Sequence, residues 1–240
     1  MIYAGWHLLF LALLSFFLGR KHLRAGTSSQ NHAQRLFGLF FIGTGVYQLV
    51  QAALYLSREI EYAVYLLPAG VIVFLVSQLI WANFVRAFTQ QLVPGFLIKF
   101  FYFCFIIVMI ASVGAWVIEP LEENVYYHNT WFPGCKMAIF YDFAPLLYFH
   151  LDLVFTLFMR FILFGFEFWY SLKQPGRLIS RLFSRLLVWE SFMWLVLLVE
   201  FAVSAGMFEF VYLFETAVYI YAFTGNLFLA EGNKPAKQFV

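Results

Sequence analysis

The chain has 240 residues, of which 63% are hydrophobic and only 12% are charged, and its formal net charge is +2. An ordinary soluble domain is about 45–50% apolar and about 25% charged, so a water-soluble fold of this size would expose too much apolar surface. The composition predicts an integral membrane protein, and it excludes a disordered chain, a disulfide scaffold and a nucleic-acid-binding protein.

Seven apolar stretches predict an all-α fold, a bundle of seven transmembrane helices in a single domain that covers residues 1–240. Each stretch has about 20 residues, the length of helix that crosses a hydrocarbon core of roughly 30 Å. The runs are continuously apolar rather than alternating, which argues against the strands of a membrane barrel. The predicted spans are about 2–19, 35–56, 63–86, 96–118, 143–171, 182–205 and 210–230.

The first span has no basic segment before its apolar run, so we expect it to be retained rather than cleaved as a signal peptide. The polar segment 19–35 follows it as a predicted connection. In the second span, small residues at helical spacing indicate close helix packing, and they are Gly38, Gly43 and Gly45.

The connections between the spans carry an orientation signal. Twelve of the 15 basic residues lie on one side of the predicted membrane. They are Arg20, Lys21, Arg24, Arg35, Arg86, Lys99, Lys173, Arg177, Arg181, Arg185, Lys234 and Lys237. The other side holds Arg58 and Lys136 together with most of the acidic loop residues. By the positive-inside rule the N-terminus lies outside and the C-terminus in the cytoplasm. We therefore expect a multi-pass protein of the plasma or inner membrane.

The fifth to seventh spans carry five charged residues at membrane depth, which are Asp152, Arg160, Glu190, Glu200 and Glu215. Such groups cost at least about 2.5–3.5 kcal/mol each unless they are paired or hydrated. A hairpin of spans five and six that turns near Pro175 places Arg160 opposite Glu190. We expect an intramembrane ion pair there, which either only orders the bundle or has a role in function.

Polar side chains from five spans fall at one depth, roughly 6–14 Å below the outer surface at about 1.5 Å per residue. They are His7, Gln48, Gln51, His150, Asp152, Glu200 and Glu215. Aromatic residues are plentiful around these polar side chains, and a concave site lined by aromatic residues with a few polar groups is typical of small-ligand binding. Three interpretations stay open: an outward-facing pocket for a small ligand or ion, a metal site held by His7, His150 and carboxylates, or polar side chains that pair between helices or face shallow water.

Motifs of catalysis and cofactor binding are absent from the sequence. It contains no GxSxG, no HExxH, no P-loop, no GxGxxG and no lysine in the seventh span that would carry retinal. No catalytic residue is predicted, and enzymatic activity is not expected. His7 and His150 are too isolated to identify haem or a metal, so the cofactor is left open.

Three segments carry a resemblance to a known group of proteins. They are the run RLFGLFFIGTGVYQLVQAALYL at 35–56, the outer segment Tyr127-His128-Asn129-Thr130-Trp131, and the basic inner connection SLKQPGRLISR at 171–181. In this layout the chain resembles the seven-helix N-terminal sensory regions of bacterial histidine kinases and diguanylate cyclases. The resemblance implies a sensory role. The chain is expected to depart from that group in having no output domain after the seventh span, so either the signalling partner is separate or the likeness is one of topology.

The sequence therefore predicts a membrane sensor or receptor-like module that binds a small ligand or ion and signals through its cytoplasmic loops. A non-catalytic subunit of a multi-protein membrane complex is the alternative from another class, and an ion- or proton-conducting protein is a third. The expected partners are the lipid bilayer and either other membrane proteins or a separate cytoplasmic signalling protein, with no nucleic acid.

Overall fold

The computed structural model describes residues 2–57, 60–118 and 146–173. These residues form five α-helices and contain no strand. The helices are α1 (Ile2–Ser28), α2 (His32–Ser57), α3 (Ile60–Phe88), α4 (Gly95–Ile118) and α7 (Leu146–Lys173). The predicted all-α class is confirmed for this part of the chain, and the predicted spans 182–205 and 210–230 lie outside it.

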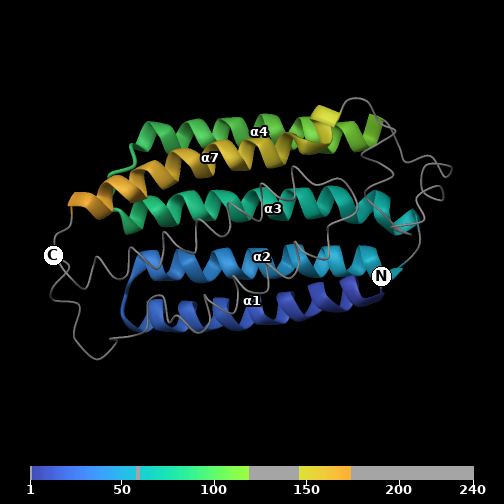
Figure 1. Ribbon diagram of the computed structural model, residues 1–240, viewed down its shortest axis with the longest axis horizontal. Coiled ribbons are helices and arrows are strands. Elements are labelled where there is room, and N and C mark those ends of the chain that lie inside the picture. Colours follow the sequence, from blue (N-terminus) through green and yellow to red (C-terminus); the bar gives the residue numbers. More distant parts are fainter. Residues whose placement is uncertain (1, 58–59, 119–145, 174–240) are drawn as a thin grey trace.

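The helices run up and down along one common direction. Figure 1 shows α1, α2 and α3 side by side in a row, with α4 and α7 on the far side of α3 from α2. Successive helices from α1 to α4 are antiparallel, and α7 runs in the same direction as α3 (Figure 1). The chain therefore reaches the same end of the bundle at the end of α1, α3 and α7.

Local signals in the connections explain where the helices stop and start. Gln30 (φ 54°) follows α1 in the left-handed conformation, which is common just after a helix end. Asn31 then caps α2, because its Oδ1 accepts a hydrogen bond from the backbone N–H of Gln34 at 3.1 Å. After α3, Gln91 (φ 66°) donates its N–H to the carbonyl of Arg86 at 2.8 Å, and Pro94 precedes α4.

The first helix is longer than the sequence pattern predicts. The expected connection 19–35 is helical as far as Ser28, so the real turn is only a few residues long. The prediction of a long connection was wrong because it used apolarity alone. Arg, Lys, Leu and Ala are good helix formers in any solvent, and Nε of Arg35 satisfies the carbonyl of Gly26 near the helix end at 3.1 Å.

Glycines let α1 and α2 approach closely, as the sequence predicts. A Cβ built on Gly38 would lie 2.7 Å from the backbone nitrogen of Leu23 and 2.9 Å from the carbonyl oxygen of Gly19. A Cβ on Gly45 would lie 3.2 Å from the carbonyl oxygen of Ala12. Backbone therefore meets backbone at this interface, the geometry that small residues permit in membrane bundles.

The surface of the described bundle is more apolar than that of a water-soluble bundle. Large apolar side chains point outward from α1, α4 and α7, and the most exposed are Phe96 (74%), Phe161 (70%) and Leu172 (70%). Several polar or charged side chains are buried instead, among them Ser15, Gln48, Gln78, Thr156, Arg160 and Glu167. Exposed apolar area on this scale marks a surface that contacts lipid or protein rather than water.

Two of the described helices, through the stretches His32–Ala53 and Ala69–Phe88, are long and apolar enough to cross a membrane. Gly95–Ala111 is a shorter apolar stretch. Length and composition alone are weak evidence, because the core helix of a soluble protein passes the same test. Together with the outward apolar side chains, they suggest association with a membrane.

Candidate functional site

Arg160 is the charged side chain at the centre of the described bundle. It lies on α7, is only 1% exposed, and donates from Nε to Oε1 of Gln78 on α3 at 2.9 Å. Its guanidinium carbon also lies 4.3 Å from the ring centroid of Trp81 and 5.3 Å from that of Phe40. An amide acceptor and two aromatic rings thus contact the buried cation.

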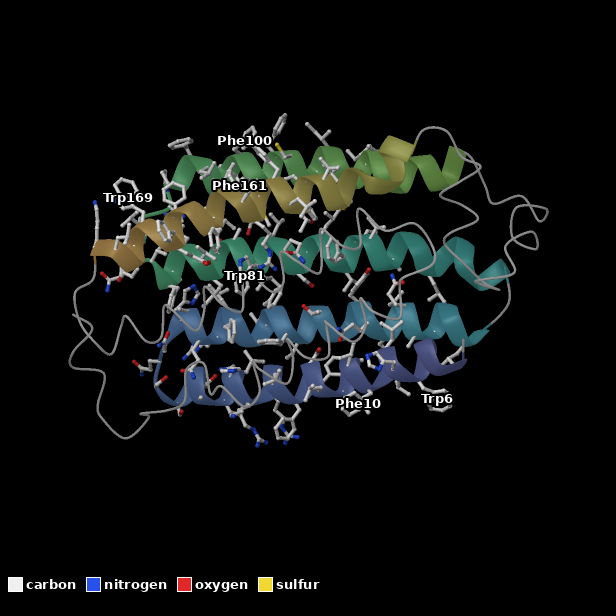
Figure 2. All side chains as sticks on the ribbon, in the orientation of Figure 1. Trp6, Phe10, Trp81, Phe100, Phe161 and Trp169 are labelled. Atoms are coloured by element: carbon white, nitrogen blue, oxygen red, sulfur yellow. The ribbon has the colours of Figure 1, made fainter. Side chains whose placement is uncertain are left out.

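Helical spacing brings these partners together. Gln78 and Trp81 are three residues apart on α3 and so share one face. The Trp81 ring packs against Phe40 of α2 with centroids 4.9 Å apart. Figure 2 shows Trp81 in the middle of the bundle, between α2 and α7. Arg160 therefore contacts side chains of two other helices at once.

A second polar contact links α1 to α2. Oγ of Ser15 lies 2.8 Å from Oε1 of Gln48 and 2.8 Å from the carbonyl oxygen of Leu11 in its own helix. Both side chains are fully buried. This contact accounts for one predicted pocket residue, Gln48, as a side chain that pairs between helices.

Gln51 is one turn further along α2 and is 5% exposed. Its Nε2 lies 3.3 Å from the position that a Cβ on Gly70 of α3 would take. The missing side chain of Gly70 therefore leaves space for the Gln51 amide. In the described part of the chain no donor reaches Oε1 of Gln51. A buried amide oxygen in this state costs about 1–3 kcal/mol, which makes Gln51 the position in this layer best suited to accept a hydrogen bond from a bound molecule.

The backbone register shows where the other predicted pocket residues fall. The antiparallel contact of Gly45 with Ala12 places His7 level with Gln51, and His7 is half-buried. Gln78 pairs with Arg160, and α3 and α7 are parallel, so Gly70 and Asp152 are level as well. His7, Gln51 and Asp152 thus share one level along the bundle.

The side chains of the other predicted site residues lie outside the described part of the chain. His150 and Asp152 lie in α7, but only their backbone is described. Glu190, Glu200 and Glu215 lie outside the described residues. The Arg160–Glu190 ion pair and the complete outer pocket therefore stay predictions.

Glu167 is a buried charge that the sequence analysis missed. It lies on α7 and is 0% exposed, although its position falls inside the predicted span 143–171. Its spacing is the signal that would have found it. Glu167 follows Arg160 by two helical turns and Thr156 precedes Arg160 by one, so all three share a face. This face is buried and polar, while Phe158 and Phe161 are exposed on the other side.

His22 is a second buried titratable group that sequence reasoning passed over. It lies beyond the predicted span 2–19 and is 2% exposed. Its ring meets Phe37 edge-on with centroids 4.9 Å apart and stacks on Phe41 at 6.3 Å. Burial, followed by the charge of Lys21, lowers the pKa of His22 from 6.5 to about 4. The imidazole is therefore neutral at physiological pH.

The described residues hold no group of three or more His, Cys, Asp or Glu side chains that would bind a metal ion. The arrangement around Arg160 offers a fixed positive charge and hydrogen-bonding amides. This site around Arg160 could bind a negatively charged or polar group, or it could hold the helices in one arrangement.

Comparisons with protein families, with curated proteins and with solved structures find no match for this chain.

Proposed function

We propose that the chain is a multi-pass membrane sensor, with seven spans, an outer N-terminus and a cytoplasmic basic end. A small ligand or ion binds in the outer half of the bundle and changes how the helices pack. The exposed apolar side chains of the described helices support the membrane location, because a surface of this kind contacts lipid or protein rather than water.

The observation that most supports a ligand site is the buried amide of Gln51. Its Oε1 lacks a donor among the described residues, and His7 and Asp152 share its level. A ligand that supplies a donor to this oxygen removes the cost of leaving it unsatisfied. Polar groups at one level within an otherwise apolar bundle are the usual pattern of a small-ligand site.

Transmission of the signal runs through α7 in this proposal. Arg160 lies about two turns from the level of Gln51 and attaches α7 to α3 through Gln78 and Trp81. A ligand that binds one packing of α7 more tightly than another shifts the population toward that packing. Because α7 ends at the basic end of the bundle, the shift reaches the proposed cytoplasmic side.

The test is thermal unfolding of the detergent-purified chain with a panel of amino acids, sugars, nucleobases and inorganic ions. A ligand at 100 times its dissociation constant stabilises by about 2.7 kcal/mol, which raises the melting temperature by several degrees. We expect at least one compound to stabilise the wild type and the exposed-site control Gln90→Leu, but not Gln51→Leu. No stabilisation by any compound contradicts the proposal.

A non-catalytic subunit of a membrane complex is the second candidate. The aromatic faces of α4 and α7 favour it, since Phe103 is 62% exposed and Phe161 is 70% exposed. Aromatic side chains are enriched where proteins meet. Purification in mild detergent separates the candidates, because a subunit retains other membrane proteins at fixed stoichiometry, whereas the proposed sensor binds its ligand without them.

A further inference from the structure

The outer face of α1 carries a continuous apolar strip. Trp6, Phe10, Leu13 and Phe17 are spaced by four, three and four residues, so they share one face of the helix. Their exposed fractions are 57%, 53%, 62% and 58%. Figure 2 shows Trp6 and Phe10 pointing away from the bundle, on the side of α1 opposite α2.

Two cations continue this strip at the same spacing. Arg20 follows Phe17 by three residues and Arg24 follows Arg20 by four, and both side chains are exposed. From Trp6 the strip extends about 21 Å to Arg20 and about 27 Å to Arg24, at 1.5 Å per residue. This length is close to the roughly 30 Å thickness of a hydrocarbon core. A tryptophan at one end and cations at the other match the two interfaces of a bilayer.

Charge decides which occupant fits the strip. A second copy of the chain in the same membrane orientation would pair the two α1 faces in parallel about a two-fold axis. That arrangement would place Arg20 against Arg20 and Arg24 against Arg24, and like charges repel. A negatively charged lipid complements the same face, because its acyl chains cover the aromatic strip and its phosphate neutralises the cations.

We propose that this α1 strip, defined by Trp6, Phe10, Leu13, Phe17, Arg20 and Arg24, binds an anionic phospholipid. The lipid phosphate lies between the guanidinium groups of Arg20 and Arg24, which are one turn apart and suited to bidentate contacts with phosphate oxygens. The acyl chains lie along Phe17, Leu13 and Phe10. This inference rests on the proposed membrane location and is independent of the proposed ligand at Gln51.

The experiment uses the full chain in liposomes and begins with flotation. A chain that does not float with the vesicles overturns the membrane location itself. For a chain that does float, spin-labelled phosphatidylglycerol and phosphatidylcholine give the relative association of each lipid with the protein surface.

Two variants with equal loss of charge make the lipid test specific. Arg20→Gln/Arg24→Gln removes the cations of the strip, whereas Lys99→Gln/Lys173→Gln removes two exposed cations from α4 and α7 at the same end of the bundle. We expect the first variant to lower the preference for phosphatidylglycerol by at least about fivefold, the effect of one cation near a membrane surface. The second variant retains most of the preference. An unchanged preference in the first variant, or an equal loss in both, overturns the proposal.

Discussion

Arg160 is a buried cation whose burial the neighbouring side chains must offset. Burying a cation costs several kcal/mol unless the protein replaces the lost water. Here the replacement is a hydrogen bond to Gln78 and the faces of Trp81 and Phe40. A hydrogen bond to a charged group contributes about 1.5–3 kcal/mol, and a desolvated cation–π contact contributes up to about 2 kcal/mol. The partners thus offset much of the cost of burial.

Removal of the amide acceptor should therefore be costly. We expect Gln78→Leu to lower the free energy of unfolding by about 2 kcal/mol, because Nε of Arg160 then loses its hydrogen bond. The double variant Gln78→Leu/Arg160→Leu should recover part of this loss, since no buried donor remains. Denaturant unfolding in detergent measures both effects. Additive losses for the two substitutions would contradict direct coupling.

His22 makes stability depend on pH. The unfolded chain takes up a proton near pH 6.5, whereas the folded imidazole, with its lowered pKa, remains neutral down to about pH 4. The unfolded state thus binds more protons between these values, and stability falls as the pH is lowered from 6.5 to 4. The full loss is about 3 kcal/mol. In His22→Leu this component of the pH dependence of unfolding should disappear, and a pH profile identical to that of the wild type would contradict the assignment.

At the scale of elements, the interface between α1 and α2 depends on glycine. A methyl group at Gly38 meets the backbone of both Leu23 and Gly19, so the helices must separate to admit it. We expect Gly38→Ala to destabilise the chain by about 1–3 kcal/mol, the usual cost of overpacking.

Gly165 provides the matched control for this interface. It lies on α7, and apart from its two chain neighbours and the backbone of its own helix, nothing lies within 4 Å of the position that a Cβ would take there. Gly165→Ala should be neutral or stabilise by up to about 1 kcal/mol through helix propensity. Thermal unfolding of both variants gives the comparison, and equal effects would show that packing against α1 is not the cause.

The sequence predicts elements better than it predicts contacts. Apolar run length locates α2, α3, α4 and α7 to within a few residues, because burial or lipid contact requires long apolar stretches. Apolar run length misplaces the end of α1, because residues 20–28 are mostly polar and nevertheless form part of the helix. It also gives no sign that Gln78 faces Arg160, because that contact depends on how α3 and α7 pack in space.

Buried charge was partly accessible from sequence. Arg160 stands alone among apolar residues and is found at once, but Glu167 lies near the polar end of its span and is easily assigned to the surface. The seven-residue spacing between them is the information that corrects this assignment. The sequence places His7, Gln51 and Asp152 at one level, since helical rise alone sets it, whereas the outer pocket itself stays a prediction.

At the scale of the whole molecule, the described cations mark one end of the bundle. Except for Arg160, every Lys and Arg in the described residues lies toward the end where α1, α3 and α7 stop, and they are Arg20, Lys21, Arg24, Arg35, Arg86, Lys99 and Lys173. An apolar surface with cations at one end is the arrangement expected of a bundle whose basic end faces the cytoplasm.

Cysteine labelling in intact cells tests this arrangement most directly. In a background of Cys104→Ser/Cys135→Ser, single cysteines replace Ser29, between α1 and α2 at the basic end, and Ser57, at the opposite end of α2. We predict that a membrane-impermeant thiol reagent modifies the cysteine at 57 in intact cells, and the cysteine at 29 only after permeabilisation. Modification at 29 in intact cells, or recovery of the chain in the soluble fraction, would contradict a membrane bundle with a cytoplasmic basic end.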